Sequence, residues 1–180
     1  MNCLACKTIS LVPHDLETNL TSFECPACGG RWIEAFQYWN WLHQLGNNLP
    51  EHPAQETELP VADSKEAKIC PECGRILSRC RVGHDLHFVV ERCVGCGGIW
   101  FDRNEWENLK SRNLHDDVHF IFSAAWQAKV RKEELETKLD ELLRAKVGKQ
   151  DFAEIQRIRE WLRAHPFGRQ LYAYLKPVQE

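Results

Sequence analysis

The sequence predicts a small α+β protein: two short cysteine-bearing β units, each followed by a short helix, and then a C-terminal α-helical hairpin. Three observations support this: four Cys-x-x-Cys pairs, a repeated stretch around two of them, and helical periodicity after residue 116. The chain has 180 residues, of which 43% are hydrophobic and 27% charged. This is ordinary globular composition, and the length suits one or two small domains.

Eight of the nine cysteines fall into two matched sets of Cys-x-x-Cys pairs, separated by 18 residues in the first set and 19 in the second. Each such turn points two thiolates at one ion, and two turns on neighbouring hairpins complete a tetrahedral S4 shell. The spacing therefore predicts two zinc ribbons with one ion each; zinc is the default, and iron takes the same ligand set. The predicted ligands are Cys3, Cys6, Cys25 and Cys28 in the first ribbon and Cys70, Cys73, Cys93 and Cys96 in the second.

The location of the protein is predicted from its N-terminus and its thiols. The first residues lack the basic and apolar segments of a secretory signal, and no apolar run approaches the roughly 18 residues of a membrane span. An odd cysteine count also argues against a disulfide framework. We expect a cytoplasmic protein without membrane contact. Cys80 is left over, either as a small buried hydrophobe or as a spare ligand or redox-sensing thiol.

Residues 25–32 and 93–100 are copies of one unit, Cys-x-x-Cys-Gly-Gly-x-Trp. The tryptophans, Trp32 and Trp100, are each expected to cap the small core of their ribbon. A short helix is expected after each copy, at about 35–45 and 103–110. In the second copy Asp102 and Glu105 have the spacing of a capping box, with Asp102 at the N-cap.

The stretch from Cys70-Pro71-x-Cys73-Gly74 to Cys96-Gly97-Gly98-x-Trp100-x-Asp102-Arg103-x-Glu105 resembles the transcription-factor-IIB-type zinc-ribbon family of small prokaryotic proteins. The resemblance covers residues 70–109 and, more loosely, 1–45, where the first pair lacks the Pro and Gly. It implies that the eight paired cysteines are zinc ligands. It implies no single biochemical role, because ribbons serve nucleic-acid binding, protein docking and stabilisation alike.

The predicted domains are a first ribbon at 1–45, a flexible acidic linker containing prolines at 46–68, a second ribbon at 69–113 and a helical region at 114–180. In the last region Leu135, Leu139 and Leu142 recur at helical spacing, Gly148 interrupts, and a second helix follows up to Pro166. Two helices joined so closely are expected to fold back as an antiparallel hairpin, with a last short turn at 167–175.

No catalytic motif is evident, and closed S4 sites build structure, so we expect a non-enzyme without a small-molecule substrate. His115 and His119 have the spacing of a metalloprotease pair, with Asp116 between them. No third ligand is evident, and the segment stands where a helix is expected to begin. Helix capping and solvated histidines are therefore favoured over a hydrolase site.

The predicted function is a non-catalytic adaptor that binds a protein partner through aromatic residues of the first helix, Phe36, Trp39 and Trp41. The alternative is a nucleic-acid-binding or transcription-associated protein using a basic face of the second ribbon. Residues 1–62 carry two bases against seven acids, so the first ribbon is a poor phosphate binder. The candidate nucleic-acid residues are Arg75, Arg79, Arg81 and Arg92.

Overall fold

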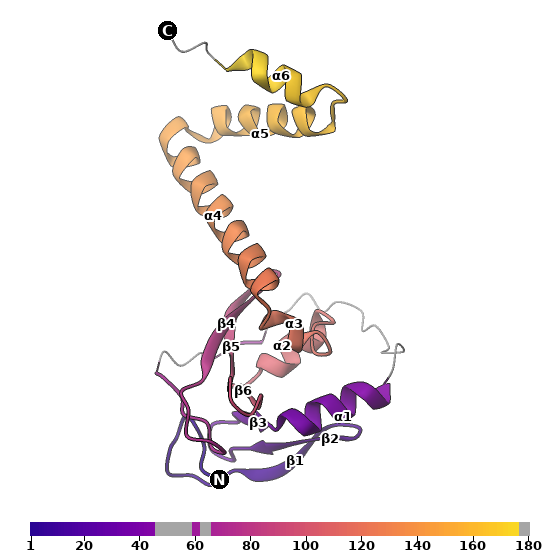
Figure 1. The fold of residues 1–180 in the computed structure, drawn as a ribbon. Helices are drawn as coiled ribbons and strands as arrows, with labels where there is room; N and C mark the ends of the chain where they lie inside the picture. The colour runs from indigo at the N-terminus through magenta and orange to yellow at the C-terminus, as the bar shows by residue number, and fades with distance from the viewer. Residues whose placement is uncertain (46–58, 62–65, 177–180) are drawn as a thin grey trace. The chain divides into compact units, whose positions relative to one another are not determined.

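The computed structural model describes residues 1–45, 59–61 and 66–176, so most of the predicted linker lies outside the described residues. The chain divides into two compact units, Met1–Val130 and Arg131–Glu180. Both belong to a small α+β protein with a six-stranded antiparallel sheet (Figure 1).

The first unit contains the sheet, whose strand order is β1-β2-β3-β6-β5-β4. Each cysteine set belongs to three neighbouring strands, and the two groups of three meet at the antiparallel β3–β6 pair, where Trp32 lies opposite Trp100. The sequence left open whether the two halves touch; they share one sheet. The strands are β1 Val12–Glu17, β2 Leu20–Glu24, β3 Arg31–Ile33, β4 Ser78–Gly83, β5 Leu86–Arg92 and β6 Ile99–Phe101.

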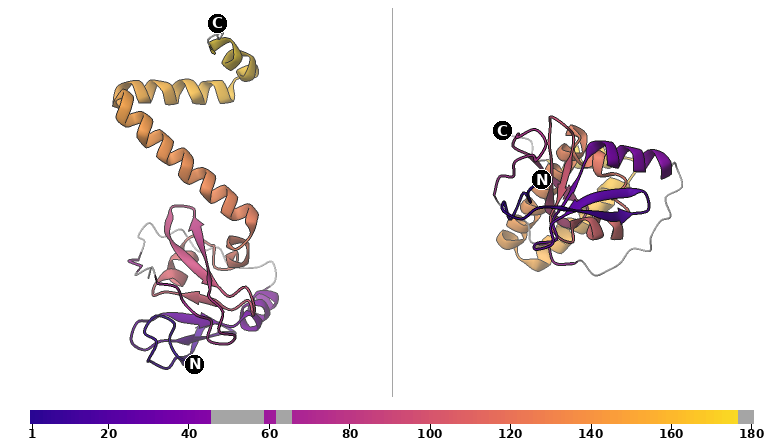
Figure 2. Two further views of the ribbon diagram at one scale, coloured as in Figure 1. Left: turned by 60° about the vertical axis from the view of Figure 1, so that its left-hand side comes forward. Right: turned by 90° about the horizontal axis from the view of Figure 1, so that it is seen from below.

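Helices cover one face of this sheet and cysteine loops lie on the other. Alternation along β6 points Ile99 and Phe101 to the helical face and Trp100 to the opposite face. The helical face packs against α1 Ala35–Leu45, α2 Glu105–Ser111 and α3 Val118–Ile121 in one apolar core. Figure 2 shows α1 beside the β1–β2 hairpin, and α1 contacts β2. A second apolar cluster joins both tryptophans to the cysteine loops.

The helix α1 has the bounds that the sequence predicted, whereas α2 begins at Glu105, later than expected. Asn104 precedes α2 in the left-handed region, at φ 69°, and no side chain caps the helix from that position. Half of the predicted capping box is present, because the Asp102 backbone N–H donates to Glu105 Oε2 at 2.8 Å. The Asp102 carboxylate does not cap; it accepts hydrogen bonds from Trp100 and Lys68 instead.

The start of α4, Ala124–Val147, is fastened to β4 within the first unit. Trp126 Nε1 donates to the Val82 carbonyl oxygen at 2.8 Å, and the Gln127 amide bonds both the N–H and the carbonyl of Arg81. The Gln127 side chain thus pairs with the backbone of an edge strand as a neighbouring strand would.

The second unit contains the rest of α4, then α5 Lys149–Ala164 and α6 Gly168–Leu175. Its main helix–helix packing is between α5 and α6, and not the predicted hairpin of the two longer helices. The leucines expected to face that hairpin, Leu135, Leu139 and Leu142, are exposed. None of the described helices is both long and apolar enough to cross a membrane.

Candidate metal centres

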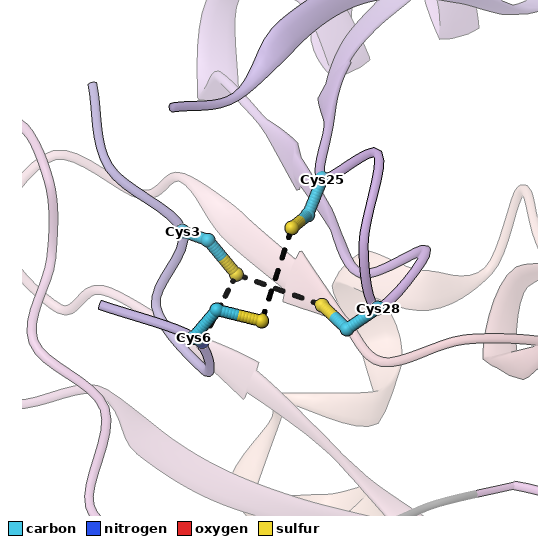
Figure 3. Close-up of side chains that lie close together, drawn as sticks. All are labelled: Cys3, Cys6, Cys25 and Cys28. Atoms are coloured by element: carbon cyan, nitrogen blue, oxygen red, sulfur yellow. Dashed lines mark hydrogen bonds between the residues drawn. The ribbon is translucent and has the colours of Figure 1, made fainter. Parts of the chain in front are cut away.

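The eight paired cysteines form two clusters of four, and within each cluster the sulfur atoms lie within 4.8 Å of one another. Figure 3 shows the first cluster, in which the four thiols point toward a common centre from two loops. Its Cys3–Cys28 and Cys6–Cys25 sulfur distances are 3.6 and 4.0 Å. In the second cluster Cys70–Cys96 and Cys73–Cys93 lie at 3.5 and 3.2 Å.

These separations fit zinc. A tetrahedral shell with Zn–S bonds of about 2.3 Å places its sulfur atoms about 3.8 Å apart. Within the part of the chain that the structure describes, both clusters hold four soft thiol ligands and no oxygen or nitrogen ligand, which is the donor set of a structural zinc site. The two clusters therefore fit two zinc ions, one for each half of the sheet.

All four Cys-x-x-Cys turns close in the same way. In each turn the residue after the second cysteine donates its N–H to the carbonyl of the first cysteine, at 2.8 to 3.0 Å. That residue has a positive φ in every case: Gly29, Gly74 and Gly97 adopt it freely, and Lys7 adopts it at 66°. The missing glycine at position 7 thus leaves the turn intact, at a cost of about 1 kcal/mol in backbone strain.

Backbone donors prepare one thiol of each cluster for ionisation. Burial opposes the thiolate of Cys93, but the N–H groups of Cys96 and Gly95 and the Cys73 thiol outweigh it and lower its pKa to about 6. Cys25 follows the same pattern, with its pKa lowered to about 7. Burial and neighbouring thiols raise the pKa of Cys28 and Cys96. Four thiolates therefore need a cation among them, and zinc binding must displace protons.

The two tryptophans of the repeat link one centre to the other, which corrects the expectation that each caps its own ribbon. A Cβ on Gly30 would lie 2.3 Å from the Trp100 ring, and a Cβ on Gly98 would lie 2.2 Å from the Trp32 ring. Each indole is thus in close contact with the second glycine of the pair in the opposite half. Trp32 Nε1 also donates to Glu72 Oε1, inside the second metal turn, at 2.9 Å.

A buried ionic cluster supports the second centre, and sequence reasoning missed its structural role. Lys68 Nζ lies 2.8 Å from Glu91 Oε1 and 2.9 Å from Asp102 Oδ2, and all three side chains are buried. Burial opposes the ammonium charge, but the two carboxylates outweigh it and raise the pKa of Lys68. The sequence does carry a pattern that could have indicated this cluster, because Lys68 and Glu91 each stand two residues before a Cys-x-x-Cys pair.

Cys80 lies outside both clusters, on β4 opposite Val90, and packs against the main core. Burial raises the pKa of its thiol, which lowers its reactivity. Its surroundings are those of a small hydrophobe.

The three aromatic residues proposed for partner binding separate into two environments. Phe36 and Trp39 are exposed, at 69% and 44% of their surface. Trp41 is 2% exposed and packs against Trp106, with ring centres 5.7 Å apart. The prediction of Trp41 as a surface residue is therefore wrong, because α1 turns that side toward the core.

The four candidate arginines do not share one face. Arg79 and Arg81 lie opposite Glu91 and Val89 in the β4–β5 pair, on the face away from the helices. Arg92 points to the other face, with its guanidinium 5.4 Å from the Phe122 ring centre. Arg75 packs beside Gly95 at a metal turn.

The two histidines of the Asp-containing pair have different surroundings. His115 is buried and packs against the rings of Trp41 and Trp106, whereas His119 lies 3.3 Å from the Tyr38 hydroxyl. The helix α3 begins only at Val118, so the pair does not lie on one helical face. Within the described ranges, the two cysteine sets are the clusters with metal-ligand geometry.

Comparison with known proteins agrees with this geometry over part of the chain. Residues 69–112 match the model of the transcription factor zinc-finger family, a zinc ribbon of the transcription-factor-IIB type. This confirms the resemblance for the second half, and the cysteine cluster alone supports a ribbon in the first. No curated protein and no solved structure matches the chain.

Proposed function

We propose that this protein is a non-catalytic adaptor that uses two zinc ions to hold a docking surface for a protein partner. The observation that carries the proposal is an aromatic patch formed by Phe36 and Trp39 of α1 with His119 and Phe120 of α3. The ring centres of Trp39 and His119 lie 5.1 Å apart, and those of His119 and Phe120 4.0 Å apart. Phe36, Trp39 and Phe120 are all exposed.

The patch is supported by a rigid base. The Tyr38 hydroxyl donates to the Asp116 carbonyl oxygen at 2.7 Å, which ties α1 to the segment before α3. Trp41, from the same helix, is buried against Trp106 of α2. Exposed aromatic rings on a fixed backbone lose little conformational freedom when they bind, so they serve well as the anchors of an interface.

The zinc centres support this function indirectly. A four-thiolate shell has no open position for water or substrate, so such an ion holds turns together. The β3–β6 joint and the cysteine loops fix the sheet on which α1, α2 and α3 rest. Loss of metal should therefore remove partner binding by unfolding the base of the patch.

The test starts with a partner identified by affinity capture on the zinc-loaded protein and then prepared in pure form. Replacing Trp39 by Ala should raise the dissociation constant for the partner by about 30-fold, as the loss of an interface anchor does. Trp161→Ala is the matched control, because this tryptophan is also exposed but belongs to the second unit. Both variants must keep two zinc ions per chain.

Unchanged affinity in Trp39→Ala and Phe36→Ala would refute the proposal. The same proteins should be titrated with single- and double-stranded DNA and RNA at two salt concentrations. Salt-sensitive binding that Arg79→Ala and Arg81→Ala remove would favour the nucleic-acid function instead.

A further inference from the structure

An open groove of about 940 Å³ lies between α5 and α6 of the second unit. The helices approach closely at one end, because Gly168 stands where a Cβ would lie 1.9 Å from the Leu162 carbonyl oxygen. Glycine permits this contact because it has no Cβ. Its apolar lining comes from Ile155, Ile158 and Leu162 of α5 and from Tyr172 and Leu175 of α6.

Among the residues that the structure describes, the charged ones that line this groove are all cationic, and none is acidic. Arg159 lies 3.3 Å from Asp140, which offsets part of its charge. Arg163 and Arg169 make no ion pair with any residue that the structure describes. The lining cations are Arg159, Arg163, Arg169 and Lys176.

We propose that the α5–α6 groove docks an acidic amphipathic helix of a partner protein. An α-helix is about 10 Å across, and its apolar stripe can lie along the groove while acidic residues on either side meet the arginines. Apolar walls set the fit, and the uniform sign of the rim selects against neutral and basic helices. This groove is separate from the aromatic patch, so it stands whether or not the patch binds a partner.

The chain's own exposed helical stripe is a poorer occupant, whether from the same molecule or from a second copy. Leu135, Leu139 and Leu142 of α4 form an apolar stripe, but Lys132 and Lys146 stand seven residues on either side of Leu139 and continue the same line. Seated in the groove, that stripe would bring lysines toward a cationic rim. A flat membrane surface would leave the concave apolar walls unfilled.

The test uses full-length zinc-loaded protein and a labelled synthetic helix of about five turns, with leucines on one face and glutamates beside them. Its counterpart, with lysines in place of the glutamates, is the matched peptide. Fluorescence anisotropy should show saturable binding of the acidic peptide only. The double variant Arg163→Glu/Arg169→Glu should bind it about tenfold more weakly or worse, and should gain affinity for the lysine peptide.

Arg157→Glu is the control, since Arg157 is exposed on α5, pairs with Glu154 and does not line the groove. It should leave binding unchanged. A gain of lysine-peptide binding in the double variant also shows that this variant is folded. Leu175→Asn tests the apolar lining without changing the charge of the groove, and it should weaken binding of the acidic peptide.

The proposal is overturned if the acidic peptide does not bind, if both peptides bind equally, or if Arg157→Glu weakens binding as much as the double variant. It is also overturned if vesicles of phosphatidylserine and phosphatidylcholine, or single-stranded DNA, bind in preference to the acidic peptide and lose binding in the double variant. Neither outcome depends on Trp39, so failure here is distinguishable from failure of the adaptor function.

Discussion

Trp32 and Trp100 face each other across the β3–β6 pair, and each indole covers the glycine that stands two residues before the other tryptophan. This reciprocal contact joins the two zinc centres into one structural unit. The indole of each half fills space that only a glycine of the other half leaves open.

Adding a methyl group at either glycine should therefore destabilise the whole first unit. Gly30→Ala and Gly98→Ala should each lower the free energy of unfolding by about 1–3 kcal/mol, as overpacking of a core does. Gly95→Ala is the control, because the nearest atoms that its Cβ would meet belong to the flexible end of the Arg75 side chain. Urea unfolding of zinc-loaded protein measures the difference; equal stability of all three variants would contradict the reciprocal packing.

Each cysteine cluster should hold its zinc ion independently of the other cluster. The purified protein should hold two zinc ions per chain, while Cys25→Ser and Cys93→Ser should each reduce the content toward one. Cys80→Ser should keep both ions, since Cys80 lies outside the clusters. Elemental analysis by mass spectrometry decides this, and loss of an ion in Cys80→Ser would assign that thiol a ligand role.

The buried Lys68 should contribute far more to stability than an exposed lysine. Lys68→Met removes the cation that the buried Glu91 and Asp102 carboxylates share, and leaves Glu91 with the more distant Arg79 at 3.4 Å; it should cost about 3–5 kcal/mol. Lys7→Met breaks the exposed pair with Glu66, which solvent screens, and should leave the free energy of unfolding nearly unchanged. Chemical denaturation at neutral pH compares the two. A small effect at Lys68 would mean that the carboxylates take up protons without loss of packing.

Glu105 should make the protein less stable as the pH rises. Burial, followed by the nearby charge of Asp102, raises the pKa of this carboxyl well above its usual value. The folded state then keeps a proton that the unfolded state has released, so folding stability falls as pH rises from the unfolded pKa toward the folded one. Glu105→Gln keeps an acceptor for the Asp102 N–H and removes the titration. Its stability relative to the native protein should therefore be greater at pH 8 than at pH 5.

Trp41 and Trp39 should behave as a contrasting pair. Trp41→Ala empties part of the core between α1 and α2 and should cost about 3–5 kcal/mol in the free energy of unfolding. Trp39→Ala removes an exposed ring and should leave stability within about 1 kcal/mol. Thermal unfolding of both variants checks this. A larger loss of stability in Trp39→Ala than in Trp41→Ala would contradict the burial of Trp41.

The sequence predicted the metal clusters because their signal is local. The spacing within each Cys-x-x-Cys pair sets one turn, and the gap between pairs sets one hairpin, so the eight ligands could be named without tertiary information. The helix at 35–45 was also predictable, since it directly follows a metal turn and a short strand.

The relations between distant segments were not predictable in the same way. Pairing of β3 with β6 joins residues almost 70 positions apart, and the sequence of neither strand indicates which strand it pairs with. The burial of Trp41 depends on Trp106, which lies on α2, a helix that follows the other half of the sheet in sequence. The α5–α6 packing depends on a close approach at Gly168, whereas helical periodicity alone favoured the longer pair.

The antiparallel joint at β3–β6 gives this chain the architecture of a two-fold dimer whose protomers are covalently connected. A single half would present one unpaired strand and one uncovered indole, and such a surface favours self-association. Because both halves belong to one polypeptide, each meets its complement at high effective concentration however dilute the protein is. The assembly step that would limit a one-ribbon protein is thereby part of folding.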